Sequence, residues 1–386
     1  MSLLKKFRLG ELIEVTRGAS LSGEYYSTKG EYIRLTCGNF DYRNNCFKEN
    51  TSKDNLFYTG EFREEFLLEK DDIITPLTEQ AIGLLGTTAR IPESGKYIQS
   101  QDVALVKCKT GKIDPTFCYY LISSRLVRNQ LSAAAQQTKI RHTSPDKIKA
   151  CTVWIPELEE QIAIGRLLAS LDDKIQLNKR INDNLEAMAR QLYDYWFVQF
   201  DFPNEEGKPY KSSGGAMVWN EKLKREIPQG WDILPISDIL DKYPTTKRYE
   251  TKEYLQTGKY PIIDQGDAYI VGFTNENDNL LTRHPAVLFG DHSTKVKFLD
   301  FDFARGADGT QILYSSNDAV SQYYLYLVVS SLQIPNPGYS RHFKYLKELP
   351  IVIPSLSIAN KFVNIVKPLF EEWTKNIFSN IALTKQ

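Results

Sequence analysis

The sequence lacks a hydrophobic segment long enough to cross a membrane. Its longest apolar run, Tyr323 to Val329, is far shorter than the roughly 20 residues that a spanning helix needs. The first residues, MSLLKKFRLGEL, contain no apolar stretch of the kind found in signal peptides. We therefore expect a cytoplasmic protein with no membrane partner.

The sequence is also poor in the patterns that hold disulfides, metals and phosphates. Its 5 cysteines are an odd number without a CxxC pair, and its 4 histidines include no HxxxH or HExxH spacing. No glycine-rich phosphate loop of the GxGxxG or GxxxxGK type occurs. We predict neither a metal site nor a cofactor for this chain.

Catalytic residues are equally hard to find. The run Gly290-Asp291-His292-Ser293 places three residue types of a catalytic triad side by side. Triads are assembled from distant segments of a fold, so we interpret this run as a polar loop. We predict no catalytic residues.

The charges of the chain cancel but are unevenly spread. Lys plus Arg and Asp plus Glu both number 48, whereas residues 1–155 carry 22 basic and 18 acidic residues. Between Arg125 and Lys149 there are six Lys or Arg residues and one acid, Asp146. A local surplus can form a phosphate-binding face even when the total charge is zero. A solvated basic surface is the alternative.

The chain contains an internal repeat. The segment WIPEL at 154–158 recurs as VIPSL at 352–356, an offset of 198 residues. This offset aligns two stripes with alternating steps of four and three residues, which is the step of a coiled-coil seam. The repeat predicts two long amphipathic helices, over 157–197 and 355–386, that pack together. The stripes are Ile164, Leu168, Leu171, Ile175, Asn178, Asn182 and Leu185, and Phe362, Val366, Leu369, Trp373, Asn376, Asn380 and Leu383.

Each stripe contains two asparagines, at 178 and 182 and at 376 and 380. A buried asparagine costs stability unless it is paired, but it fixes the register of a helix pair. We predict this role for them, with a solvent-facing position as the alternative. By the same offset Gln386 corresponds to Met188, so we expect the second helix to be short at its C-terminal end.

A region of mixed structure precedes each long helix. Aromatic and β-branched runs broken by Gly, Asn and Asp predict short strands, and residues 117–131 and 319–332 are expected to be helical. The predicted strands are 32–35, 72–75, 102–107, 152–155, 260–263, 286–289, 310–313 and 351–353. The fold class is therefore α/β, of the mixed α+β kind. We expect domains at 1–155 and 231–353, long helices at 156–198 and 354–386, and a connector at 199–230.

If the long helices pair antiparallel, the two domains are related by a pseudo-twofold axis. Two similar domains at a fixed separation suit a target with two separated half-sites, and duplex DNA is the usual target of that form. Reading bases needs Arg, Lys, Asn, Gln, Ser or Thr on loops that reach a groove.

We predict DNA contacts from residues of these types in both domains. The Arg-His pairs at 141–142 and 341–342 are the strongest candidates, because each comes shortly before the strand that leads into a long helix. An ordinary surface position is the alternative for any single residue. The full set is Lys29, Arg34, Asn39, Arg43, Thr87, Arg90, Gln137, Lys139, Arg141, His142, Lys247, Arg248, Gln265, His292, Thr294, Lys295, Arg305, Tyr339, Arg341, His342 and Lys344.

Longer motifs lie on and after the first long helix. Residues 155–161 are IPELEEQ, residues 171–175 are LDDKI and residues 192–197 are LYDYWF. The connector adds SGG at 213–215 and IPQGW at 227–231. With these motifs the chain resembles, over essentially its whole length, the DNA-specificity subunit of type I restriction-modification enzymes.

This resemblance implies two tandem target-recognition domains, each of which reads one half of a bipartite sequence in double-stranded DNA. The antiparallel helical pair would set the spacing and dock two modification (methyltransferase) subunits, and restriction subunits would join through the complex. The subunit itself would be non-catalytic. S-adenosylmethionine, ATP and Mg²⁺ are expected on the partner subunits only.

Two other classes of function stay open at this point. One is a protein-interaction spacer, which loops rich in Asn, Gln and Arg disfavour. The other is a DNA-modifying enzyme with built-in specificity domains, for which the length of the chain leaves no room. Salt-dependent DNA binding separates the first from a specificity subunit, and methyl transfer by the purified chain separates the second.

Overall fold

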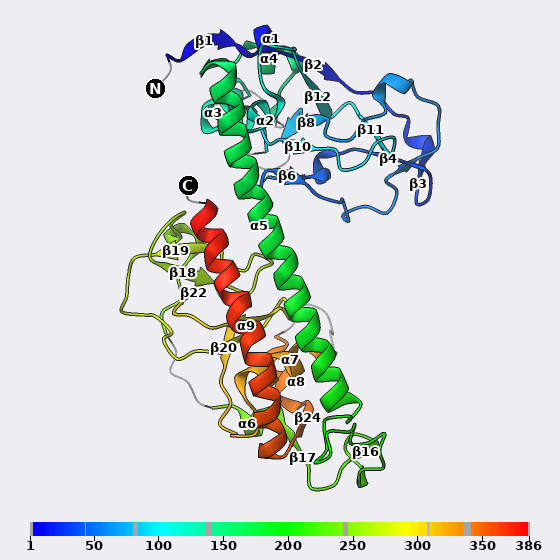
Figure 1. Cartoon of the computed structure of the whole chain (residues 1–386), viewed down its shortest axis with the longest axis vertical. Helices are drawn as coiled ribbons and strands as arrows, with labels where there is room; N and C mark the ends of the chain where they lie inside the picture. Colours follow the sequence, from blue (N-terminus) through cyan, green and yellow to red (C-terminus); the bar gives the residue numbers. More distant parts are fainter. Residues whose placement is uncertain are drawn as a thin grey trace. The chain divides into compact units, whose positions relative to one another are not determined.

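The chain divides into two compact units, Met1–Asp173 and Lys174–Gln386. The computed structural model describes residues 3–42, 44–79, 84–135, 141–241, 246–307, 309–334 and 341–384. Each unit contains short strands, short helices and part of a long helix (Figure 1). The predicted mixed α/β fold class is confirmed. Among the described residues, no helix is long and apolar enough to cross a membrane.

The first unit is built around two sheets. One has the order β10-β8-β12-β2 with antiparallel neighbours. The other has the order β11-β4-β7-β3, in which β11 and β4 are parallel. Strands β1 and β14, β13 and β9, and β5 and β6 form separate pairs. The strands are β1 (Lys5–Arg8), β2 (Ile13–Arg17), β3 (Tyr26–Ser27), β4 (Tyr32–Arg34), β5 (Phe40–Asp41), β6 (Cys46–Phe47), β7 (Phe57–Tyr58), β8 (Ile73–Pro76), β9 (Thr78–Glu79), β10 (Ala89–Arg90), β11 (Tyr97–Ile98), β12 (Val103–Cys108), β13 (Arg141–His142) and β14 (Thr152–Ile155).

The helices of the first unit begin at side-chain caps. The side chain of Asp114 accepts the N–H of Phe117 at 2.8 Å and starts α2. Ser124 starts α3 by accepting the N–H of Val127. The stretch 117–131 is helical as predicted, and the cap at Ser124 divides it into two helices. The helices are α1 (Leu9–Leu12), α2 (Pro115–Ser123), α3 (Arg125–Ala134), α4 (Pro145–Ala150) and the first part of α5 (Leu158–Tyr193).

The first part of α5 packs on α2 within this unit. The Gln161 side chain accepts the N–H of Asp114 at 3.1 Å, and the Tyr120 hydroxyl donates to the Asp172 carboxylate at 2.7 Å. A Cβ at Gly165 would lie 2.9 Å from the backbone nitrogen of Phe117, so glycine is needed for this close approach. Of the predicted stripe, Ile164 packs against the core of this unit, and Leu168 and Leu171 are half-buried.

The second unit also has two sheets. One has the order β21-β20-β23 with antiparallel neighbours, and the other has the order β19-β18-β22, in which β18 and β22 are parallel. The strands are β15 (Met217–Asn220), β16 (Arg225–Pro228), β17 (Asp232–Pro235), β18 (Tyr260–Ile263), β19 (Gly272–Thr274), β20 (Ala286–Gly290), β21 (Val296–Leu299), β22 (Ala304–Arg305), β23 (Thr310–Leu313) and β24 (Pro350–Ile353). The helices are α6 (Ile236–Ile239), α7 (Gln322–Ser331), α8 (Phe343–Glu348) and α9 (Leu356–Thr384), and a π-helical turn, Asp194–Val198, ends α5.

The two units share one order of elements. In each, an early strand pairs antiparallel with the strand that leads into the long helix, β1 with β14 and β17 with β24. A short helix follows the early strand, α1 or α6, and another precedes the last strand, α4 or α8. Each unit also has one parallel strand pair. The repeat seen in the sequence of the long helices therefore extends through the globular parts.

Within the second unit, four asparagines join α5 to α9. The Nδ2 of Asn178 donates to Oδ1 of Asn380 at 2.8 Å, and Nδ2 of Asn376 donates to Oδ1 of Asn182 at 2.9 Å. Asn182 also donates to the carbonyl oxygen of Trp373 at 3.0 Å. Because rising numbers in α5 meet falling numbers in α9, the two helices run antiparallel. We call these four residues the asparagine ladder.

Aromatic packing continues from the asparagine ladder toward the end of α5. The rings of Trp196 and Phe197 lie 5.6 and 4.8 Å from the ring of Phe362 on α9, centre to centre. All three belong to the buried core of the unit, together with Val366 and Phe370. The contact between α5 and α9 is thus polar at the asparagine ladder and aromatic nearer the C-terminal end of α5.

We expect Asn182→Ala to lower the free energy of unfolding by about 1–3 kcal/mol, because it leaves the buried Asn376 amide without its partner. The double variant Asn182→Leu/Asn376→Leu should recover most of this loss, since it removes both amides. Urea unfolding measures both changes. Asn184→Ala, an exposed position on the same helix, is the control and should change the free energy by less than about 0.5 kcal/mol. The pairing would be contradicted if the double variant lost as much free energy of unfolding as the two single variants lose together.

Candidate nucleic-acid interface

The predicted contact residues differ widely in where the fold places them. Arg43, Gln137, Lys139 and Tyr339 lie outside the described part of the chain. The others are either buried and hydrogen-bonded within their own unit or lie at or near its surface.

Three predicted residues of the first unit have buried side chains. The Arg34 guanidinium lies over the ring of Tyr26, 3.7 Å from its centre. Asn39 accepts the N–H of Thr36 at 2.9 Å, and the Thr87 hydroxyl lies 3.5 Å from Nη2 of Arg128. These groups hold their loops in place, and their contact with DNA stays a prediction.

The Arg-His pair of the first unit forms β13, which pairs with β9. Nε of Arg141 lies 3.1 Å from the Glu79 carboxylate, whose side chain is 3% exposed, and Arg141 also donates to the carbonyl and hydroxyl oxygens of Ser132. His142 is exposed, with Nδ1 3.3 Å from the Thr78 hydroxyl. The arginine therefore anchors the strand pair, and the histidine beside it faces solvent.

A basic groove of about 400 Å³ opens beside this strand pair. Two of its side chains are Arg125 and Arg128, whereas its carboxylate, Glu79, is already paired with Arg141. Arg128 donates to Oδ1 of Asn45 at 3.1 Å, and burial lowers the pKa of its guanidinium. Leu85 and hydroxyl and amide groups complete the lining, and the arginines with these polar groups suit a phosphate. The lining residues are Glu79, Leu85, Ser123, Arg125, Arg128, Asn129 and Ser132.

In the second unit, Gln265 connects two loops of the predicted set. Its side-chain oxygen accepts the N–H of His292 at 2.9 Å and that of Ser293 at 3.3 Å. Its backbone carbonyl accepts the Ser293 hydroxyl at 2.7 Å. A Cβ at Gly309 would lie 2.3 Å from Nε2 of Gln265, and Gly309 also has a positive φ of 84°. The loop after β18, the turn between β20 and β21, and the segment before β23 therefore meet at one place.

Two further predicted residues are buried and donate hydrogen bonds to the segments that meet here. Arg305 is 6% exposed and its Nη2 donates to the carbonyl oxygen of Thr310 at 2.5 Å. His342 is 3% exposed, and its backbone N–H donates to the carbonyl oxygen of Asp291 at 2.8 Å. The Arg-His pair of this unit thus has its arginine, Arg341, exposed and its histidine buried. This is the reverse of the first unit.

The remaining predicted residues lie at or near the surface. Lys247 is held by Glu253 and Glu276, each at 3.2 Å, and Lys295 is paired with Asp267 at 3.0 Å. Arg90 donates to the Thr116 hydroxyl at 3.0 Å. Thr294 occupies the β20–β21 turn with a positive φ of 56°. Exposed members of the set are Lys29, Arg248, Arg341 and Lys344.

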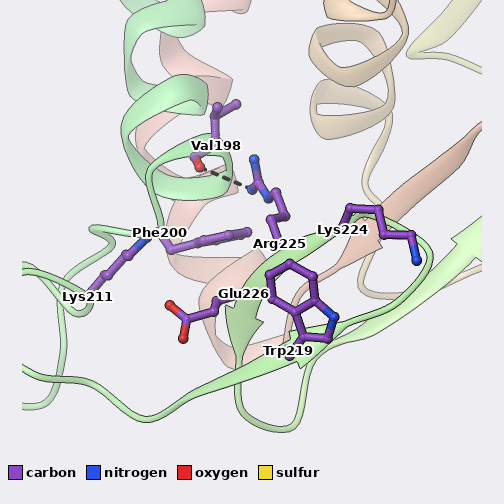
Figure 2. A pocket seen from close by; sticks show the side chains of 7 residues that line it. All are labelled: Val198, Phe200, Lys211, Trp219, Lys224, Arg225 and Glu226. Atoms are coloured by element: carbon purple, nitrogen blue, oxygen red, sulfur yellow. Dashed lines mark hydrogen bonds between the residues drawn. The ribbon is translucent and has the colours of Figure 1, made fainter.

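The connector forms a second pocket, of about 370 Å³ (Figure 2). Arg225 lies over the ring of Phe200, 4.4 Å from its centre, and donates to the carbonyl oxygen of Val198 at 3.1 Å. A cation at this point caps the carbonyl end of the helix. Arg225, which lines this pocket, therefore ties the connector to the end of α5.

Sequence reasoning missed the inward-facing Arg128 and also Lys297, which lies on β21 under the Gln265 loop. Lys297 is a charged residue in a short strand whose last three residues are all buried, and residue type gives no sign of its burial. Arg128 falls within the basic segment, but nothing there separates it from its exposed neighbours. Among the described residues, no group of three or more His, Cys, Asp or Glu could hold a metal ion.

The two units thus repeat one order of elements, and the first carries a groove lined by Arg125 and Arg128. The model of the type I restriction modification DNA specificity domain matches residues 1–187 and 228–382. The chain therefore belongs to the type I restriction-modification DNA specificity family.

Named relatives agree with this assignment. The chain is 25% identical to the MjaIX specificity subunit of Methanocaldococcus jannaschii over 294 residues, 70% of this chain and 65% of that protein. It is 28% identical to the EcoR124I/EcoR124II specificity subunit of Escherichia coli over 185 residues, 44% of this chain and 45% of that protein. The matched segments thus span less than two thirds of these relatives. The type I S subunit of M. genitalium has a similar fold, with a TM-score of 0.56, 17% identity and coverage of 99% of this chain and 93% of that chain.

We expect Arg141→Met to lower the free energy of unfolding by roughly 3 kcal/mol, because it removes the arginine that faces the buried Glu79 carboxylate. Adding Glu79→Gln should restore most of the stability, since the buried negative charge is then gone. Thermal unfolding of the single and double variants measures this. His142→Ala, the exposed neighbour, is the control. If Glu79→Gln gives no recovery, the ion pair does not anchor the β9–β13 pair.

Proposed function

We propose that this chain is the DNA sequence-recognition subunit of a type I restriction-modification complex. The observation that carries the proposal is the tandem match of the family model, which falls once on each half of the chain. Each half has its own globular part and its own long helix. Each globular part would read one half of a bipartite target in double-stranded DNA, as expected for a repeated recognition module.

The long helices would set the spacing between the half-sites and dock two modification subunits. The asparagine ladder supports this role, because it allows one register of α5 against α9 within the second unit. The restriction subunits would join through the complex. The chain would act in the cytoplasm without chemistry of its own, with S-adenosylmethionine, ATP and Mg²⁺ bound by its partners.

Methylation mapping tests this function directly. Single-molecule sequencing of DNA from host cells with and without the gene should reveal a new adenine mark at a split, asymmetric motif. Co-expression with the modification subunit ensures that the partner is present. Unchanged methylation in the presence of a co-purifying modification subunit would contradict the proposal. Methyl transfer by the purified chain alone would instead favour an enzyme with built-in specificity.

We expect the basic groove of the first unit to hold a DNA phosphate. Arg125→Ala should weaken binding of the complex by a similar factor for all DNA sequences and reduce the slope of log Kd against log salt by about 1. A salt titration with fluorescent duplexes measures the slope. Lys112→Ala is the matched control, because it removes the same charge from an exposed position that does not line the groove. Equal slopes for the two variants would argue against a phosphate site there.

A further inference from the structure

A buried lysine ties together the loop that carries Gln265. Lys297 on β21 is 6% exposed, and its Nζ donates to the carbonyl oxygens of Asp264 at 2.7 Å and Ala268 at 2.6 Å. Nζ also lies 4.0 Å from Oδ1 of Asp264. One ammonium group therefore holds both ends of the loop 264–268.

The loop passes this constraint on to the turn between β20 and β21. Gln265 lies inside the loop and accepts the backbone N–H groups of His292 and Ser293. The same turn carries Lys295, which is exposed and pairs with Asp267 of the loop at 3.0 Å. The backbone of the loop 264–268 thus connects the buried amine, through hydrogen bonds and an ion pair, to two of the predicted DNA contacts.

Packing alone does not account for a lysine at this position. An ammonium group is unfavourable in a protein interior unless its hydrogen bonds are satisfied, and an apolar side chain of similar length fills the same volume without that cost. The two carbonyl acceptors converge on Nζ, so the charge is used to fix backbone atoms of the loop.

We propose that Lys297 is a positioning residue for the second half-site: its charged amine fixes the loop 264–268 and, through Gln265, the turn that presents His292 and Lys295 to DNA. This inference rests on the proposed function. It adds a residue that does not touch DNA but sets how well one half of the target is distinguished.

The protonation of Lys297 gives the proposal a pH signature. Burial lowers the pKa of this amine to about 8, while Asp264 and Asp267 oppose the shift and Lys295 adds to it. Because the folded chain loses this proton before the unfolded chain does, the contribution of Lys297 to the free energy of unfolding rises between pH 8 and its ordinary pKa of 10.5. The neutral amine makes weaker bonds to the two carbonyls, so the loop loosens over the same range. Recognition should fall while stability does not.

The experiment uses the chain in complex with its modification subunits. Binding is measured at pH 7 and pH 9 for a duplex with both mapped half-sites and for duplexes with either half-site scrambled. Discrimination at a half-site is the Kd for the duplex in which that half-site is scrambled divided by the Kd for the duplex with both half-sites. We expect discrimination at the second half-site to fall by about tenfold at pH 9, the value of one weakened charge-assisted bond, and discrimination at the first half-site to stay constant.

Variants separate a positioning role of Lys297 from a purely structural one. Lys297→Met should show the low ratio at both pH values, and Lys297→Arg, which stays charged, should keep the high ratio at pH 9. Lys295→Met, on the same hairpin, should weaken binding, and because Lys295 helps to lower the pKa of Lys297, it should move the fall in discrimination to higher pH. Gln265→Ala, which breaks the same path outside the core, should behave as Lys297→Met and serves if the core variants fail to fold.

The outcomes distinguish failure of the proposed function from failure of the positioning role. If the unaltered complex binds cognate and scrambled duplexes equally, the proposed function is wrong. If the unaltered complex discriminates, and the Lys297→Met or Gln265→Ala complex discriminates equally well at the second half-site, only the positioning role is wrong. A fall in the free energy of unfolding between pH 8 and pH 9 that parallels the loss of discrimination would also overturn it, because the change would then be general unfolding.

Discussion

The architecture of the second unit depends on the asparagine ladder. A pair of helices with only apolar stripes can slide by a heptad at little cost, but buried amides are satisfied in one register alone. Asn178 and Asn182 each find an asparagine of α9 opposite them. Because β24 leads directly into α9 at Ile353-Pro354, the register also fixes β17, the strand that pairs with β24, relative to this part of α5.

The first unit attaches its helix by different contacts that have the same effect. Strand β14 leads into α5 through Ile155-Pro156, and Gln161 bonds both to the start of α2 and to the carbonyl oxygen of Pro156. The close approach at Gly165 completes the contact. Each globular part is therefore joined to its helix by a strand and by side chains, not by a flexible link. Such rigid attachment is what a recognition module needs if helix geometry is to control where it reads.

The fold was far more predictable than the site. The Ile-Pro junctions predicted where α5 and α9 begin, and strands β14, β18 and β23 lie where residue type predicted them. The division of 117–131 into two helices was not predicted, because a serine acts as a cap only in the context of the fold. Residue type alone also does not report burial: Arg34, Arg305 and His342 have the chemistry of base-reading residues, and their side chains are buried within their own units.

That burial has a consequence for how specificity can change. A loop held by an internal cation, Arg34 over Tyr26 or Lys297 under the Gln265 loop, keeps its shape when the exposed residues around it are replaced. Under the proposed function, exposed positions such as His292 and Lys295 would vary with the DNA sequence that is read, while the anchors hold the loops and the asparagine ladder holds α5 against α9. Variation at an anchor acts differently, because it moves several contacts together. Recognition of a new half-site is therefore expected to arise through the exposed turn residues, with the buried cations unchanged.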